Sequence, residues 1–230
     1  MPNVTPTDPS MAVAAVLDLL IQQGYEATSV EELADAAGIS RSTFFRKYGS
    51  KEGMVFADHD RILRQLNDHL TYSTGDPLQA VADAAAMVFD HHLHHRRTAL
   101  ARYQLLQQVP ALRDRELVTS HSYERAFRLH LQAALPENAR RDYGAIAVAA
   151  AMVAVHNAFL RQWLRAPDAV PAVELRSRLK GELAALAETF RRELYGSGSD
   201  GDRPPAVIVT VFESGANKQD ILEAINRAIP

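Results

Sequence analysis

The stretch that decides the fold is residues 29–48, which read SVEELADAAGISRSTFFRKY. Ser29 and Glu32 have the spacing of a capping box, in which each side chain satisfies a backbone N–H at the start of a helix. Gly38 can adopt the left-handed conformation that ends this helix, and Ser40 can cap another helix that begins at Arg41. The pattern therefore predicts two short helices that flank a turn of about three residues.

The second of these helices concentrates positive charge. No acidic residue occurs between Ala36 and Lys51, although the formal net charge of the chain is -3. Phe44 and Tyr48 can point inward while the basic and hydroxyl side chains turn outward. A short basic helix that is braced by another across a turn has the build of a helix-turn-helix, which places its second helix in the DNA major groove. On spacing alone, the alternative is a helical hairpin whose cations face solvent.

Composition indicates a globular chain and excludes several kinds of chemistry. The 230 residues are 47% hydrophobic and 23% charged, which is enough to form a large core. The absence of Cys excludes disulfides, a thiol nucleophile and cysteine metal sites. No basic start of a secretory signal precedes the first apolar run, and the longest such run, Ala145 to Val155, falls short of the roughly 20 residues of a membrane span. We expect a cytoplasmic protein with no membrane partner.

Helical periodicity runs from Ser10 to Tyr195, and Pro or Gly usually falls where one apolar stripe ends. We therefore expect an all-α body. Besides the two short helices, the pattern predicts a first helix that ends at Gly24, a linking helix from Lys51 to about Leu70, and later helices over 77–95, 97–109, from an irregular turn at Pro110 to 135, 138–165 and 173–195.

Residues 25–52, YEATSVEELADAAGISRSTFFRKYGSKE, resemble the DNA-binding domain of the TetR family of bacterial transcriptional regulators. The likeness spans about Ala12 to His69, and the turn, caps and aromatic positions agree in register. It implies that the helix matching Ser40 to Tyr48 reads double-stranded DNA and that the residues at Thr28 and Lys51 contact phosphates. The DNA-binding residues expected are Thr28, Ser40, Arg41, Ser42, Thr43, Phe45, Arg46, Lys47 and Lys51.

Two positions depart from the family pattern. The family commonly has Tyr at the position of Phe45, where its hydroxyl bonds a phosphate, and Phe cannot make that bond. The family also often has a basic stretch before the first helix, which Met1 to Ser10 lacks. This puts a minor-groove arm in doubt.

The resemblance implies that the rest of the chain binds a small-molecule effector and forms a homodimer. The expected organisation is a disordered leader (1–10), a helix-turn-helix domain (11–70), a ligand-binding and dimerisation domain (71–195), and a linker with a strand-helix tail (196–230). In that tail, 206–212 is β-branched and 217–229 is amphipathic. We expect the strand to pair with its copy in the other subunit, or the helix to cover an apolar groove.

Between residues 77 and 165, aromatic and long apolar side chains are interleaved with a few polar groups. A pocket with such a lining would suit a hydrophobic effector. An acyl chain or a drug-like aromatic would fit, and Arg102, Arg125 or Arg128 could hold an acidic head group; for any single residue, ordinary core is the competing interpretation. The ligand-binding residues expected are Phe89, Leu93, Tyr103, Leu106, Gln107, Tyr123, Phe127, Met152, His156, Phe159 and Trp163.

The last two long helices are the candidates for a dimer interface, because a four-helix bundle across a two-fold axis would pair two DNA-reading helices. The alternative is that their apolar stripes pack within one subunit. The residues expected at the interface are Ala145, Ala149, Val153, Phe159 and Leu160 on one helix and Leu175, Leu179, Leu183, Leu186 and Phe190 on the other.

His91 and His95 have the i, i+4 spacing of a metal site, but no third ligand is identifiable, and no catalytic motif occurs. We therefore expect no metal, no cofactor and no enzyme. The predicted function is a ligand-responsive repressor that releases a palindromic operator when a hydrophobic molecule binds. The alternative is a helical protein that binds a metal or small molecule and does not act on DNA.

Overall fold

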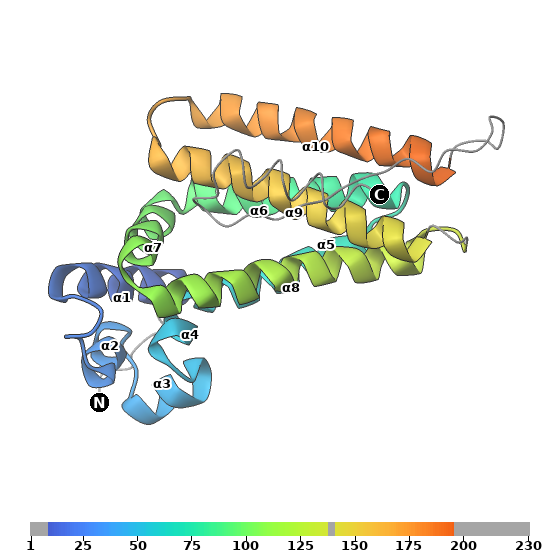
Figure 1. The fold of residues 1–230 in the computed structure, drawn as a ribbon. Coiled ribbons are helices and arrows are strands. Elements are labelled where there is room, and N and C mark those ends of the chain that lie inside the picture. The colour runs from blue at the N-terminus through green and yellow to red at the C-terminus, as the bar shows by residue number, and fades with distance from the viewer. Residues whose placement is uncertain (1–8, 138–140, 196–230) are drawn as a thin grey trace, which may run out of the picture.

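The computed structural model describes residues 9–137 and 141–195, and all regular structure in these ranges is helical (Figure 1). The all-α prediction is thereby confirmed for the described part of the chain. The helices are α1 (Pro9–Gln23), α2 (Val30–Ala36), α3 (Arg41–Tyr48), α4 (Lys51–Val55), α5 (Ala57–Tyr72), α6 (Pro77–His94), α7 (Arg96–Gln108), α8 (Pro110–Ala134), α9 (Arg141–Arg165) and α10 (Ala172–Tyr195).

Local capping forms the helix-turn-helix as the sequence predicts. The Glu32 amide donates to Ser29 Oγ at 3.2 Å, and the Ser29 amide donates to Glu32 Oε2 at 2.7 Å, which completes the capping box. Gly38 has a φ of 66°, and Ser40 Oγ accepts from the Thr43 amide at 3.2 Å. These contacts fix the start and end of α2 and the start of α3.

The predicted linking helix from Lys51 to Leu70 is not continuous. It breaks at Phe56, where φ is -107° and ψ is 12°, so α4 and α5 are separate helices. The break has a tertiary cause: Arg102 on α7 donates to the Val55 main-chain oxygen at 3.0 Å, and the Phe56 ring is buried. The irregular turn predicted at Pro110 is also wrong, because Pro110 opens α8 directly, as proline can at the first helical position.

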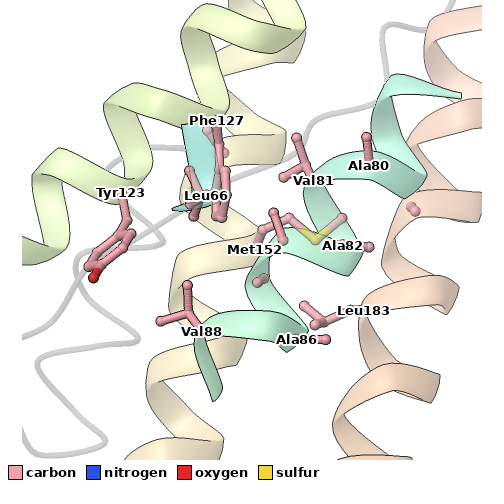
Figure 2. Close-up of a cluster of buried hydrophobic side chains, with 14 of the residues drawn as sticks. Leu66, Ala80, Val81, Ala82, Ala86, Val88, Tyr123, Phe127, Met152 and Leu183 are labelled. Carbon is pink, nitrogen blue, oxygen red and sulfur yellow. The ribbon is translucent and has the colours of Figure 1, made fainter. Parts of the chain in front are cut away.

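Two hydrophobic cores divide the chain differently from the predicted boundary at residue 70. The smaller core joins α1–α4 to α7 and the start of α8, and Arg97 on α7 pairs with Asp18 on α1 at 2.5 Å. The larger core joins α5, α6, α8, α9 and α10, with Val88, Phe127 and Met152 among its side chains (Figure 2). Helix α8 therefore contributes to both cores, as does α7, which adds Ala99 to the larger one.

Most of the side chains predicted for the dimer interface are buried within one subunit, so that prediction is wrong for them and the alternative holds. Their stripes pack α9 and α10 against α6 and against each other. Ala145, Ala149, Leu175, Leu179, Leu183 and Phe190 lie in the larger core, whereas Val153, Phe159, Leu160 and Leu186 are half-buried against it.

Helix α9 is long and strongly apolar. Its segment Asp142–Arg165 spans 24 residues and has the length and composition of a membrane-crossing helix. In the fold it packs against α6, α8 and α10, and Val148 and Met152 are fully buried there. Packing in a helical bundle therefore accounts for part of its composition.

The predicted tail falls outside the described residues. The linker, the strand at 206–212 and the helix at 217–229 all lie in 196–230, so they stay predictions. Of the predicted leader, residues 1–8 also lie outside, while α1 begins at Pro9.

Candidate DNA-binding surface and effector cavity

The outer face of α3 carries the exposed basic side chains. Phe44 is fully buried and packs edge-to-face on Tyr48, with ring centroids 5.4 Å apart, which anchors the helix to the smaller core. Arg41, Arg46 and Lys47 are all exposed. The cationic face predicted from the sequence is therefore presented to solvent.

Neighbouring groups orient these cations without burying them. Arg41 Nε lies 2.7 Å from Glu31 Oε1 on α2, and its guanidinium lies 5.5 Å from the centroid of the Phe45 ring, which is 42% exposed. Lys47 Nζ lies 5.0 Å from the Tyr48 ring centroid. An exposed pair of this kind contributes little stability, so DNA can compete for the arginine.

The hydroxyl groups at the start of α3 bond to one another. Ser40 Oγ lies 3.0 Å from both Ser42 Oγ and Thr43 Oγ1 while it caps the Thr43 amide. Arg46 Nη2 reaches to 3.5 Å from Thr43 Oγ1. The main role of Ser40 is therefore to cap α3. Ser42, in contrast, is exposed on the same face as the cationic side chains.

Thr28 and Lys51 are placed differently from the rest of the predicted set. Thr28 is fully buried, and its hydroxyl donates to the Gly24 main-chain oxygen at 2.7 Å. This geometry argues against the phosphate contact expected of its side chain. Lys51 is half-buried beside Tyr25 and donates to the Tyr25 main-chain oxygen at 3.0 Å. It stays a candidate phosphate contact because an ammonium has further donors.

A cavity that is partly open to solvent lies between the two cores. Side chains from the α4–α5 junction and from α5, α6, α7, α8 and α9 line it. Five of the side chains predicted from the sequence are among them: Tyr103, Leu106, Tyr123, Phe127 and His156.

The other predicted ligand-binding residues lie elsewhere. Phe89 and Met152 are buried in the larger core, Gln107 is exposed, and Phe159 is half-buried against the core. Leu93 and Trp163 line a separate hollow near Pro167. Of the arginines proposed to hold an acidic head group, Arg125 and Arg128 do not line the cavity, and Arg128 instead donates to Gln132 at 2.8 Å.

Sequence reasoning missed several polar residues of the lining. His59 gave no separate signal, because it sits in a stretch that already read as amphipathic helix. The α8 residues did have one: they repeat every three or four positions and so share one face of a helix. These are Glu116, Thr119 and Ser120, which continue into Tyr123 and Phe127.

A buried ion pair closes the cavity at the α4–α5 junction. Arg102 Nη2 lies 2.5 Å from Asp58 Oδ1, and these side chains are 6% and 5% exposed. Arg102 also donates through Nη1 to His59 Nε2 at 3.1 Å and through Nε to the Val55 oxygen at 3.0 Å. Burial alone would raise the pKa of Asp58, but the Arg102 guanidinium holds it well below its usual range. The pair therefore stays ionised.

The histidines around the cavity are neutral. Burial lowers the pKa of His59 to about 3 and that of His156 to about 4, and it lowers the pKa of His92 well below its ordinary value. Burial has the opposite effect on the Glu116 carboxyl, whose pKa it raises. The lining thus presents neutral imidazoles and the Glu116 carboxyl around one compensated ion pair.

The predicted His91–His95 spacing does bring two imidazoles together, with ring centroids 4.2 Å apart. Burial and the neighbouring His95 lower the pKa of His91 to about 4. Within 9–137 and 141–195, no group of three or more His, Asp or Glu side chains could hold a metal ion. The pair therefore lacks the further ligands that a metal site needs.

An exposed cationic helix of a helix-turn-helix, joined to a helical domain with an internal cavity, defines the class of DNA-binding transcriptional regulators. Residues 12–57 match the family model described as bacterial regulatory proteins, tetR family, so this segment is similar to the DNA-binding domain of that family.

The chain is similar to two curated regulators. It is 27% identical to the HTH-type transcriptional regulator TcmR from Streptomyces glaucescens over 203 residues, which cover 84% of this chain and 86% of TcmR. It is 42% identical to YvkB, an uncharacterised HTH-type transcriptional regulator from Bacillus subtilis, over 43 residues. That match covers 19% of this chain and spans 23% of YvkB.

A solved structure shares the fold. The crystal structure of a TetR-family regulator from Syntrophomonas wolfei aligns with a TM-score of 0.60 at 12% sequence identity, over 78% of this chain and 94% of that one. At this identity the likeness concerns the fold alone.

Proposed function

We propose that the protein is a homodimeric repressor that releases its DNA operator when a mainly hydrophobic small molecule enters the cavity between the cores. The observation that carries this proposal is the position of Phe56, His59 and Arg102. They line the cavity, and they surround the break between α4 and α5. An occupant of the cavity therefore contacts the structure that positions the DNA-reading helix.

The path from the cavity to α3 is short. Helix α4 packs on both α1 and α3, and its last residue, Val55, is held by Arg102. A ligand that displaces Phe56 or Arg102 would shift α4 and change the separation of the two α3 helices in a dimer. For a coupling free energy of about 1–3 kcal/mol, operator affinity would change about 5- to 150-fold.

The DNA-reading surface is proposed to be the exposed face of α3. Arg41 and Arg46 are suited to guanine edges, Ser42 and Thr43 to bases or phosphates, and Lys47 and Lys51 to phosphates. The Phe45 ring would make an apolar contact.

The dimer interface is proposed to be the outer face of α9 and α10. Ile146 is 45% exposed, and Ala154 and Ala158 are also exposed on α9. On α10, Gly181 and Ala184 are exposed, and no atom lies within 4 Å of the position of an added Gly181 Cβ. Small side chains on both helices allow close approach of a second copy. We place the protein in the cytoplasm, where its DNA target is found.

Two measurements test this function. A mobility shift of the full chain on DNA from directly upstream of its own gene, at two salt concentrations, should show binding that weakens steeply with salt. Sedimentation should show a dimer that Ala154→Glu dissociates, whereas Ala133→Glu, at an exposed position on α8, does not. Binding without salt dependence, or a wild-type monomer at micromolar concentration, would contradict the proposal.

A further inference from the structure

A chain of hydrogen bonds determines which atoms on one wall of the cavity donate and which accept. Arg102 can only donate, so His59 Nε2, 3.1 Å from Arg102 Nη1, must accept. The proton of this neutral imidazole therefore sits on Nδ1, which lies 3.0 Å from the Tyr123 hydroxyl oxygen and donates to it. The Tyr123 oxygen is thus occupied as an acceptor, and its O–H remains available as a donor toward the cavity that Tyr123 lines.

His156, in contrast, offers the cavity a hydrogen-bond acceptor. This residue also lines the cavity and is 8% exposed. Its Nδ1 lies 3.2 Å from Asn157 Oδ1, an amide oxygen that can only accept, so Nδ1 carries the proton. In the neutral ring, Nε2 is then a bare acceptor. This atom is buried and has no hydrogen-bond partner in the described part of the chain. A buried polar atom without a partner is costly, so a ligand donor at this point would be favourable.

The cavity offers no uncompensated positive charge for an anionic ligand. Arg102 is the one cationic side chain among its described lining residues, and all three of its nitrogens donate to Val55, Asp58 and His59. The remaining wall is largely apolar, with Val88, Phe127 and Leu160 among its side chains. An acidic head group would have to break the buried ion pair.

We propose that the cavity binds an uncharged, largely apolar molecule that donates a hydroxyl or N–H to His156 Nε2 and accepts from the Tyr123 hydroxyl through an oxygen atom. This inference rests on the proposed function, in that the cavity is taken to be the effector site. Of the head groups considered from the sequence, it excludes an acidic one.

Isothermal titration of the full chain without DNA tests the ligand class with one matched series. 3-Hydroxybenzophenone offers a ketone acceptor and a hydroxyl donor, 3-methoxybenzophenone lacks the donor, and 3-benzoylbenzoate replaces it with a carboxylate. We expect the hydroxyl compound to bind about three- to tenfold more tightly than the methoxy compound, the usual range for one neutral hydrogen bond. The carboxylate should bind least tightly.

Variants assign the two contacts. His156→Phe should reduce the affinity for the hydroxyl compound to that for the methoxy compound, and His156→Gln, which restores an acceptor oxygen, should recover part of it. Tyr123→Phe should weaken both compounds equally. His130→Phe is the matched control, because His130 also has a buried unpaired Nε2 but does not line the cavity. Nitrogen-15 NMR should show His156 protonated on Nδ1.

Several results would overturn the inference: equal affinities for the hydroxyl and methoxy compounds, preference for the carboxylate, no binding of any compound at millimolar concentration, or a proton on His156 Nε2. None of these results affects the binding of ligand-free protein to DNA. Conversely, a hydroxyl preference in a protein that fails to bind its upstream DNA would support the ligand class and refute the proposed function.

Discussion

Arg102 on α7 donates to the main-chain oxygen of Val55, the last residue of α4, at 3.0 Å. This bond joins the wall of the cavity to the helix that supports α3. The same guanidinium compensates the charge of the Asp58 carboxylate, so one side chain both fixes the α4–α5 junction and leaves the buried pair without a net charge.

Arg102→Met should therefore destabilise the protein strongly. It leaves Asp58 buried without a partner, and the loss of one member of a buried pair costs about 3–5 kcal/mol. Adding Asp58→Asn should recover part of this free energy of unfolding, because it removes the unpaired charge. Urea denaturation measures both effects. Arg192→Met is the control, since the Arg192 side chain is 77% exposed and should leave stability unchanged. An Arg102→Met variant whose free energy of unfolding is unchanged would contradict the role assigned to the pair.

The buried histidines should make the protein sensitive to mild acid. Their pKa values in the folded state, about 3 for His59 and about 4 for His156, lie below the ordinary value near 6.5. The unfolded chain therefore binds more protons below pH 6.5, and the free energy of unfolding should fall as the pH drops from 6.5 to about 4. Each such group contributes up to about 1.4 kcal/mol per pH unit.

Urea denaturation at a series of pH values measures this slope. His156→Gln removes one of the groups and should flatten it. Stability that is constant or rises between pH 6.5 and pH 5 would show that these imidazoles are not held neutral.

Gly53→Ala should distort the helix-turn-helix. An added Cβ would lie 1.9 Å from the main-chain oxygen of Tyr48, the last residue of α3, and backbone atoms cannot move aside cheaply. We expect a loss of about 1–3 kcal/mol in stability, as for other overpacked sites, together with weaker DNA binding. At Gly144 the added Cβ would meet only the end of the Leu194 side chain, so Gly144→Ala is a control that should have little effect. Equal effects of the two substitutions would rule out this close approach.

Phe45→Tyr should strengthen DNA binding. The Phe45 ring is 42% exposed beside Arg41, and a hydroxyl on it could donate to a phosphate. The gain should be about three- to tenfold in affinity, with an unchanged salt dependence because no charge is added. Fluorescence anisotropy on a labelled operator measures both quantities. Weaker binding of the tyrosine variant would place this ring away from the DNA backbone.

The helix-turn-helix was predictable because its determinants are local. Ser29, Glu32, Gly38 and Ser40 act on backbone groups within a few residues of themselves, and the structure confirms each of them. The break at Phe56 was not predictable, since it depends on Arg102, 47 positions from Val55 in the sequence. Periodicity detects an apolar stripe but not a kink that a distant side chain stabilises.

Prediction from the sequence was limited in the same way at the cavity and at the dimer surface. Tyr123 and His156 were both predicted as ligand-binding residues, but His59 was not, because its role depends on the Arg102 and Tyr123 contacts. An apolar stripe predicts that Leu179 is buried, yet it does not say whether its own subunit or a second one covers it.

The most direct test of the central claim, that α3 reads DNA, is the affinity of the Arg41→Ala/Arg46→Ala double variant for the upstream DNA, measured by anisotropy beside a scrambled duplex. Circular dichroism and thermal unfolding should show an unchanged fold, because both side chains are exposed. We predict that the variant loses its preference for the specific duplex, at about 1–3 kcal/mol for each base contact. A variant that binds its operator as tightly and as selectively as the wild type would contradict it.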